Sequence, residues 1–465
     1  MKRLIAMLCA LAMVISLCAC AKDGKDGATT ETNNATVLVP DITAKPSDIF
    51  MSTENFSFTV AEATYGFSVI YNGFYSQNAN YLSFYGIDIN ETLKTQEYSD
   101  DVSWFEYFGD QLTAELEAYL IYCEAAKAAG FELTEEMKKS IDDIINEMNQ
   151  FALDYAYEPE YYIKLNYGDI VTEADIRSYL EKMMLATHYS EELYNSYSFT
   201  EADEDAYLAE HREEFEYVNF IGYTMTETLD REASVNAKEL MNTATEADFY
   251  AYIENYEANV IKKEVGCQTY DYYTRLDNEL SDWAFSAEIG DRFIYSDALA
   301  GQYTVCVMQT KPAIQEYNVR DFRCIDLSTT EHSSFEEALK KANEIASEWK
   351  AGEATAESFS TFAKKYSEDE NAKSGSVYAR ADKSTPILTD EAIKWLFEDA
   401  AIGEVAIFEK PTGYIILYYE NEGRVQWRVQ AYDSLFEEAY MADMNKFEEA
   451  YKIAFDEEMI WQIDK

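Results

Sequence analysis

From about residue 56 to residue 213, apolar residues recur with the period of an amphipathic helix. One segment ends at Gly130, a suitable C-cap, and carries its apolar residues on one face: Leu112, Leu116, Tyr119, Leu120 and Cys123. A second segment starts after Thr134, an N-cap residue that is followed by two glutamates. Thr172 and Thr200 precede two further segments of the same kind. The pattern predicts a helical domain over residues 56–213 whose apolar stripes form its core.

After residue 213 the chain repeats one pattern. Trp283 and Trp395, Phe285 and Phe397, and Gly301 and Gly413 are each 112 positions apart. Each copy starts with a strand-like segment (215–225 and 316–328), continues into amphipathic helices and ends in a second strand-like segment (301–309 and 413–421). This predicts a tandem duplication of a β-α-α-β domain over 214–313 and 314–424, with a further strand or short helix possible in the variable loop.

The last segment, 425–465, is predicted to be a helix with an apolar stripe formed by Leu435, Phe436, Ala439, Tyr440, Phe447, Tyr451 and Phe455. A single helix this apolar must pack against another part of the chain, and the helical domain is the natural partner. The predicted fold class is α+β and mainly helical.

Composition and charge narrow the possible partners. Hydrophobic residues make up 48% of the 465 residues, which is typical of a folded chain. A formal charge of −51 argues against binding nucleic acid or anionic lipid through the bulk surface. That charge could attract basic unfolded polypeptide, or it could simply be a solvated surface. The chain contains no HExxH, P-loop, GxSxG or Cys/His metal spacing, so no cofactor and no metal are predicted.

The N-terminus joins Lys2 and Arg3 to an apolar run that ends in Leu17-Cys18-Ala19-Cys20. This run resembles the lipobox of bacterial lipoproteins. The resemblance implies removal of residues 1–19, a lipid on Cys20, and a flexible tether over 20–55 that anchors an extracytoplasmic protein to a bacterial membrane. An ordinary cleaved signal peptide is the alternative. Four cysteines remain: Cys123, Cys267, Cys306 and Cys324. The sequence does not decide whether they form disulfides or remain free thiols.

The second copy resembles the parvulin-type (PpiC-like) peptidyl-prolyl isomerase domain almost end to end. The most specific phrases are "FAKKYSED", "IGEV" and "TGYIIL", and the first copy resembles the same domain more faintly. The segments "YLIYCEAAKAAGFELTEE" and "YYIKLNYGDIVTEADIRSYL" resemble the helical N-terminal domain of SurA/PrsA-type extracytoplasmic foldases. With the lipobox, these resemblances cover nearly the whole mature chain. They imply a helical chaperone domain, completed by the C-terminal helix, that carries two parvulin-like domains.

The resemblance also implies which residues occupy the isomerase site. Asp369 falls on a family Cys/Asp position. The family's first-strand histidine falls on Asp321, or on Arg323 in a shifted register, and its last-strand histidine on Ile415. A substrate groove is expected from Leu388, Ala392, Phe397 and Ile415, and the first copy offers Phe220 and Thr304 on its strands. The only histidines, His188, His211 and His332, lie elsewhere.

The sequence therefore predicts a membrane-anchored chaperone or foldase that binds unfolded or nascent secreted polypeptides, with degenerate isomerase domains and a homodimer as one possible assembly. Two alternatives stay open. One is an active prolyl isomerase that uses Asp369, with Asp321 as its second carboxylate. The other is a solute-binding lipoprotein, although the duplicated short α/β domains argue against it.

Overall fold

The computed structural model describes residues 41–99, 102–227, 232–258, 268–297, 299–369, 373–375 and 377–463, with side chains at 258 and 268–272 left out. The lipobox, most of the tether and Cys267 therefore lie outside the described residues. The chain forms two compact units. Unit 1 contains the chain up to Ser198 together with Glu438–Lys465, and unit 2 is Phe199–Glu437.

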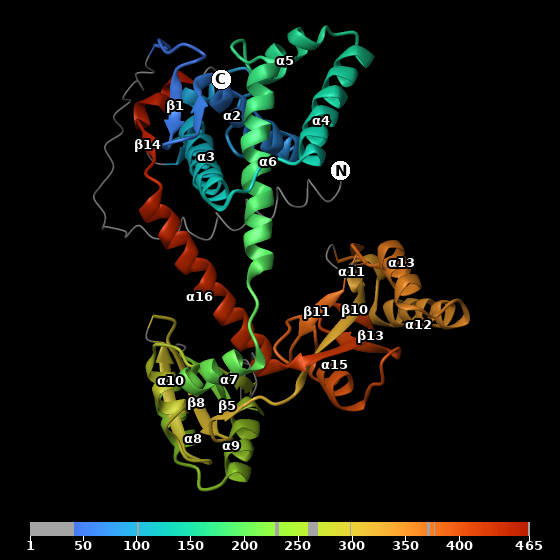
Figure 1. Cartoon of the computed structure of the whole chain (residues 1–465). Coiled ribbons are helices and arrows are strands. Elements are labelled where there is room, and N and C mark those ends of the chain that lie inside the picture. Colours follow the sequence, from blue (N-terminus) through green and yellow to red (C-terminus); the bar gives the residue numbers. More distant parts are fainter. Residues whose placement is uncertain are drawn as a thin grey trace. The chain divides into compact units, whose positions relative to one another are not determined.

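Unit 1 is a helical domain (Figure 1). Its helices are α2 (Val60–Asn78), α3 (Trp104–Ala129), α4 (Glu135–Asp154), α5 (Pro159–Tyr167) and α6 (Glu173–Ser196). The predicted caps are present: Thr134 and Thr172 each accept a hydrogen bond from the third helical N–H, and Gly130 ends α3 at φ +72°. Glycine suits this position because it carries no Cβ that would clash in the left-handed region. The core includes Leu112, Leu116, Leu120, Ile141, Ile176 and Met184.

The chain's last residues belong to unit 1. Strand β14 (Ala454–Phe455) pairs with β1 (Ile49–Ser52), which also pairs with β2 (Ser57–Thr59). Ile460 and Ile463 enter the core, and the hydroxyls of Tyr122 and Tyr440 are 2.8 Å apart. The prediction that the C-terminal segment packs on the helical domain is confirmed from residue 438 onward.

Unit 2 contains two modules with the same topology. Module 1 has β5 (Glu216–Thr226), α8 (Ala233–Met241), α9 (Glu246–Ala258), β6 (Gln268–Tyr273), α10 (Glu279–Ala284), β7 (Arg292–Asp297) and β8 (Gln302–Met308). Module 2 has β10 (Asn318–Ser328), α11 (Thr329–His332), α12 (Phe335–Ala351), α13 (Ala356–Tyr366), β11 (Tyr378–Ala381), α15 (Asp390–Lys394), one π-helical turn (Trp395–Asp399), β12 (Val405–Lys410) and β13 (Gly413–Val425). Their antiparallel sheets run β6-β5-β8-β7 and β11-β10-β13-β12, so corresponding strands occupy corresponding places. The predicted duplication is present, and the four-stranded sheet of each copy has two more strands than the β-α-α-β pattern.

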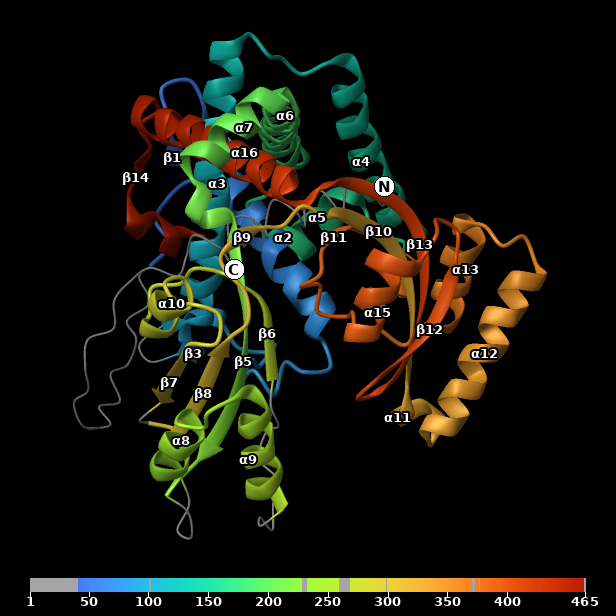
Figure 2. The same cartoon turned by 90° about the horizontal axis from the view of Figure 1, so that it is seen from below.

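Each sheet of unit 2 is buried on both faces. In module 2, α12 and α13 cover one face and α15 the other (Figure 2). Strand β10 alternates accordingly: Ile325 and Leu327 pack towards α12 and α13, while Phe322 and Cys324 pack towards α15. Successive side chains of a strand point to opposite faces, so every second residue of β10 shares the α15 face.

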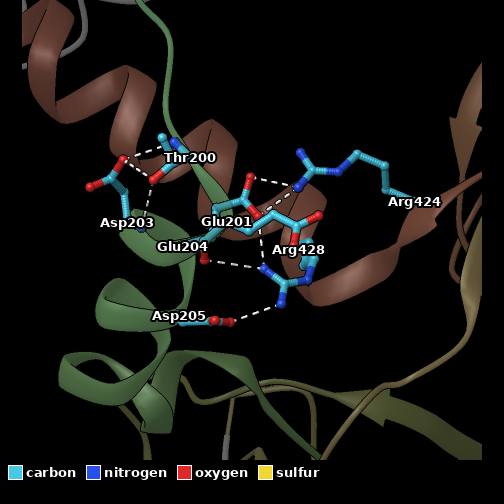
Figure 3. Close-up of polar contacts among 7 residues, drawn as sticks. All are labelled: Thr200, Glu201, Asp203, Glu204, Asp205, Arg424 and Arg428. Carbon is cyan, nitrogen blue, oxygen red and sulfur yellow. Dashed lines mark hydrogen bonds and ion pairs between the residues drawn. The ribbon is translucent and has the colours of Figure 1, made fainter.

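Helix α7 (Glu201–Glu210) belongs to unit 2, although the sequence pattern placed it in the helical domain ending at 213. Its fully buried Glu204 accepts two hydrogen bonds from Arg424 (2.6 and 2.7 Å) and one from Arg428 (3.0 Å; Figure 3). Arg424 is the second-last residue of β13 and Arg428 lies in the first turn of α16 (Gln426–Ala450), so these ion pairs hold α7 against the end of module 2. A buried carboxylate needs such partners, and they lie more than 200 positions away in the sequence.

Candidate functional site

The α15 face of module 2 is the candidate site. On this face the register of β10 and β13 pairs Asp326 with Ile415 and Cys324 with Leu417. Phe408 of β12 pairs with Ile415 from the other side. An apolar surface therefore surrounds one buried carboxylate, Asp326.

Lys410, the last residue of β12, forms an ion pair with the Asp326 carboxylate. The Asp326 N–H donates to Ser367 Oγ at 3.1 Å, and its carbonyl oxygen accepts from the Glu368 N–H at 2.9 Å. These backbone contacts hold the segment after α13, which carries Asp369, against this strand.

Asp369 acts electrostatically on the same face. Burial raises the pKa of the Cys324 thiol well above its usual value, and the carboxylates of Asp326 and Asp369 raise it further while Lys410 opposes them. Burial likewise raises the pKa of Tyr378, with added repulsion from Cys324, Asp369 and Asp326. Cys324 therefore stays a protonated thiol at neutral pH and is no nucleophile.

The sequence-predicted Asp321 lies elsewhere. It pairs with Asn421, six positions along β13 from Ile415, and accepts hydrogen bonds from the Arg380 N–H (2.7 Å) and Asn421 Nδ2 (3.2 Å). The alternative, Arg323, forms an ion pair with Glu420 at 2.6 Å. The residue opposite Ile415 is Asp326, which sequence reasoning missed. A single acid inside the apolar run "CIDL" was the available signal.

The predicted groove residues share the α15 face but are packed together. Leu388, Ala392 and Ile415 are buried, and Phe397 is half-buried against Tyr317 (ring centroids 5.2 Å apart). Their side chains are thus core contacts of module 2. The histidines stay outside this cluster, each beside a glutamate: His188 by Glu191, His211 by Glu214 and His332 by Glu368.

Module 1 shows what remains at the corresponding positions. Its register pairs Thr224 with Thr304, and their hydroxyl oxygens are 2.8 Å apart. Phe220 occupies the place of Phe322, each lying four residues before the polar position on its strand. Module 1 therefore has a neutral hydroxyl pair where module 2 has Asp326 and Ile415.

Within the described ranges, no group of three or more His, Cys, Asp or Glu side chains could hold a metal ion. Cys123, Cys306 and Cys324 are buried. None of the helices in the part of the chain that the structure describes is both long enough and apolar enough to cross a membrane.

Residues 325–421 match the family model of the rotamase, a PPIC-type PPIase domain. The chain therefore carries a domain of the parvulin-type peptidyl-prolyl isomerase family, and this domain is module 2. A search among curated proteins found no match.

Two solved structures are similar to parts of the chain. One is the foldase protein PrsA from Streptococcus pneumoniae, at 14% identity and a TM-score of 0.19, covering 48% of this chain and 77% of that one. The other is a structure described with PEB4 and Cj1289, two SurA-like chaperones of Campylobacter jejuni. Its identity to this chain is 12% and its TM-score is 0.13, and the match covers 57% of this chain and 81% of that one. At such identities and TM-scores, neither likeness bears on activity or on the arrangement of the two units.

Proposed function

We propose that this chain is an extracytoplasmic foldase, anchored through lipid on Cys20, that binds unfolded secreted polypeptides. Module 2 does not isomerise Xaa-Pro bonds efficiently. The proposal draws on the PPIC-type match of residues 325–421 and on the lipobox-like N-terminus.

The main observation behind this proposal is that the cross-strand pair Asp326–Ile415 offers no free polar side chain to a substrate. Isomerisation of an Xaa-Pro bond takes roughly 10–100 s unaided, and a catalyst must stabilise the twisted amide with preorganised polar groups. Here the ammonium of Lys410 is engaged by Asp326, and Ile415 offers no polar atom. Leu388 and Ala392 are packed into the core, so the apolar side of the site is also filled.

Two measurements on the full mature chain test this function. We expect near-stoichiometric amounts to suppress aggregation of a chemically unfolded secreted protein. We also expect Xaa-Pro isomerisation in a short peptide, measured by exchange NMR, to stay within about twofold of the uncatalysed rate. Failure to suppress aggregation would contradict the chaperone function.

The second candidate function is an active prolyl isomerase. The observation in its favour is that the carboxylates of Asp326 and Asp369 both raise the pKa values of Cys324 and Tyr378. Two carboxylates and the ammonium of Lys410 therefore lie near the α15 face of module 2. In that case the rate would rise at least about tenfold, and Asp369→Ala and Asp326→Asn would abolish the rise. Asp321→Asn is the matched control, because Asp321 lies opposite Asn421, and it would leave the rate unchanged.

A further inference from the structure

Unit 1 carries a continuous row of aromatic rings where α4 (Glu135–Asp154) ends and α5 (Pro159–Tyr167) begins (Figure 1). Ring centroids lie 4.7 Å apart between Tyr155 and Phe151, 5.8 Å between Phe151 and Tyr162, 6.4 Å between Tyr162 and Tyr157, and 5.8 Å between Tyr157 and Tyr161. We call these five residues the aromatic row.

Four rings of the aromatic row are open to solvent, and the fifth, Tyr162, is half-buried. The exposed fraction is 65% for Tyr155, 57% for Tyr161, 49% for Phe151 and 39% for Tyr157. Leu153 and Leu165 are also exposed. Contiguous exposed rings on a soluble domain are unusual and mark interaction surfaces.

The charge around the aromatic row is negative. Residues 147–169 contain five carboxylates (Glu147, Asp154, Glu158, Glu160 and Asp169) and one basic side chain, Lys164. Lys164 forms an ion pair with Glu160 at 2.8 Å, so its charge is compensated locally. The faces of tyrosine and phenylalanine rings attract ammonium and guanidinium groups, and nearby carboxylates add to that attraction.

We propose that the aromatic row is the docking surface for Lys- and Arg-rich segments of unfolded polypeptide, which it recognises through ring faces bordered by carboxylates. This proposal rests on the proposed chaperone function and specifies its substrate class. Anionic membranes and nucleic acids are disfavoured here by the same carboxylates. A second copy of this chain, equally acidic, is also a poor partner.

The test compares two labelled, unfolded peptides that differ only in carrying lysine or glutamine at alternate positions. Affinity for the full mature chain is measured by fluorescence anisotropy. We expect the lysine peptide to bind roughly tenfold more tightly than the glutamine peptide, since each ring contributes a few-fold through its face. The preference should weaken with added salt.

Two triple variants distinguish binding through aromatic ring faces from binding through apolar surface area. Tyr155→Leu, Tyr157→Leu and Tyr161→Leu together should remove the preference for the lysine peptide, whereas the corresponding Tyr→Phe triple variant should keep it. All three side chains are exposed, so both variants should fold, which circular dichroism verifies. Tyr81→Leu with Phe84→Leu is the control: it removes two other exposed rings of unit 1 (62% and 86% exposed) and should leave the preference intact.

Three results would overturn the inference: equal binding of both peptides, an unchanged preference in the leucine variant, or a dimer in light scattering that the leucine variant dissociates. If the chain still suppresses aggregation of an unfolded protein in any of these cases, the chaperone function stands. If it neither suppresses aggregation nor binds either peptide, the proposed function fails as well.

Discussion

At the scale of single residues, Glu115 of α3 illustrates how burial is linked to pH. Its Oε1 accepts hydrogen bonds from the hydroxyls of Tyr119 (2.7 Å) and Tyr179 (3.1 Å). Burial raises the pKa of the Glu115 carboxyl above its usual 4.5, and the two tyrosine hydrogen bonds only partly oppose this. The folded state therefore holds this proton more tightly than the unfolded chain. The protonated Glu115 carboxyl therefore stabilises the folded state. This contribution is fully present below the pKa of Glu115 in the unfolded chain and is lost as the pH rises through its pKa in the folded state.

Glu115→Gln should consequently stabilise unit 1 at pH 7, because the amide removes a buried charge and its Oε1 can still accept both hydrogen bonds. At a pH below 4, where wild-type Glu115 is protonated, the two proteins should unfold with equal free energies. Urea denaturation at several pH values measures this difference. Glu136→Gln, on the exposed side of α4, is the control, and an equal gain from both changes would contradict the explanation.

At the scale of elements, the residues repeated 112 positions apart now have structural roles. Trp283 stacks on Phe293 of β7, and Trp395 packs on Phe408 of β12, both with centroids 5.4 Å apart. Gly413 has φ +151°, and a Cβ there would lie 2.0 Å from the Leu327 carbonyl oxygen. The repeated tryptophans thus anchor a helix to the sheet, and this glycine allows two strands to approach.

The contact between α7 and α16 depends on Glu204. Glu204→Gln should lower the free energy of unfolding of unit 2 by about 2–4 kcal/mol, because the arginines then lose the charge that they share. Glu201→Gln is the matched control: Arg428 donates to the Glu201 carbonyl oxygen (3.3 Å), which the change leaves in place, so the change should cost less than about 0.5 kcal/mol (Figure 3). Calorimetry of both variants measures the difference, and equal losses would show that the ion pairs contribute little.

At the scale of the whole molecule, the N-terminus bears on where the chain resides. If Cys20 carries the lipid, Cys20→Ser should move the protein from the membrane fraction to the soluble fraction of a lipoprotein-processing bacterium. Cys18→Ser, two positions earlier, should leave it in the membrane fraction. Fractionation with immunodetection distinguishes the variants, and retention of both at the membrane would contradict anchoring through Cys20.

The sequence alone determined the helix caps, the duplication and the mainly helical α+β class. Caps depend on residues within one turn, as with Thr134 and the Met137 N–H, and strand faces follow from alternation. These features need no knowledge of distant partners, so local pattern was sufficient.

Tertiary structure decided the features that join distant residues. The pairing of Asp326 with Ile415 spans a whole module, and a shift of a few positions in the inferred register had pointed to Asp321. The membership of α7 in unit 2 depends on Glu204 meeting arginines more than 200 positions away. Glu115 accepts a hydrogen bond from Tyr179 of another helix. Burial and charge pairing are set by which elements pack together, and periodicity along one element carries no information about its partner.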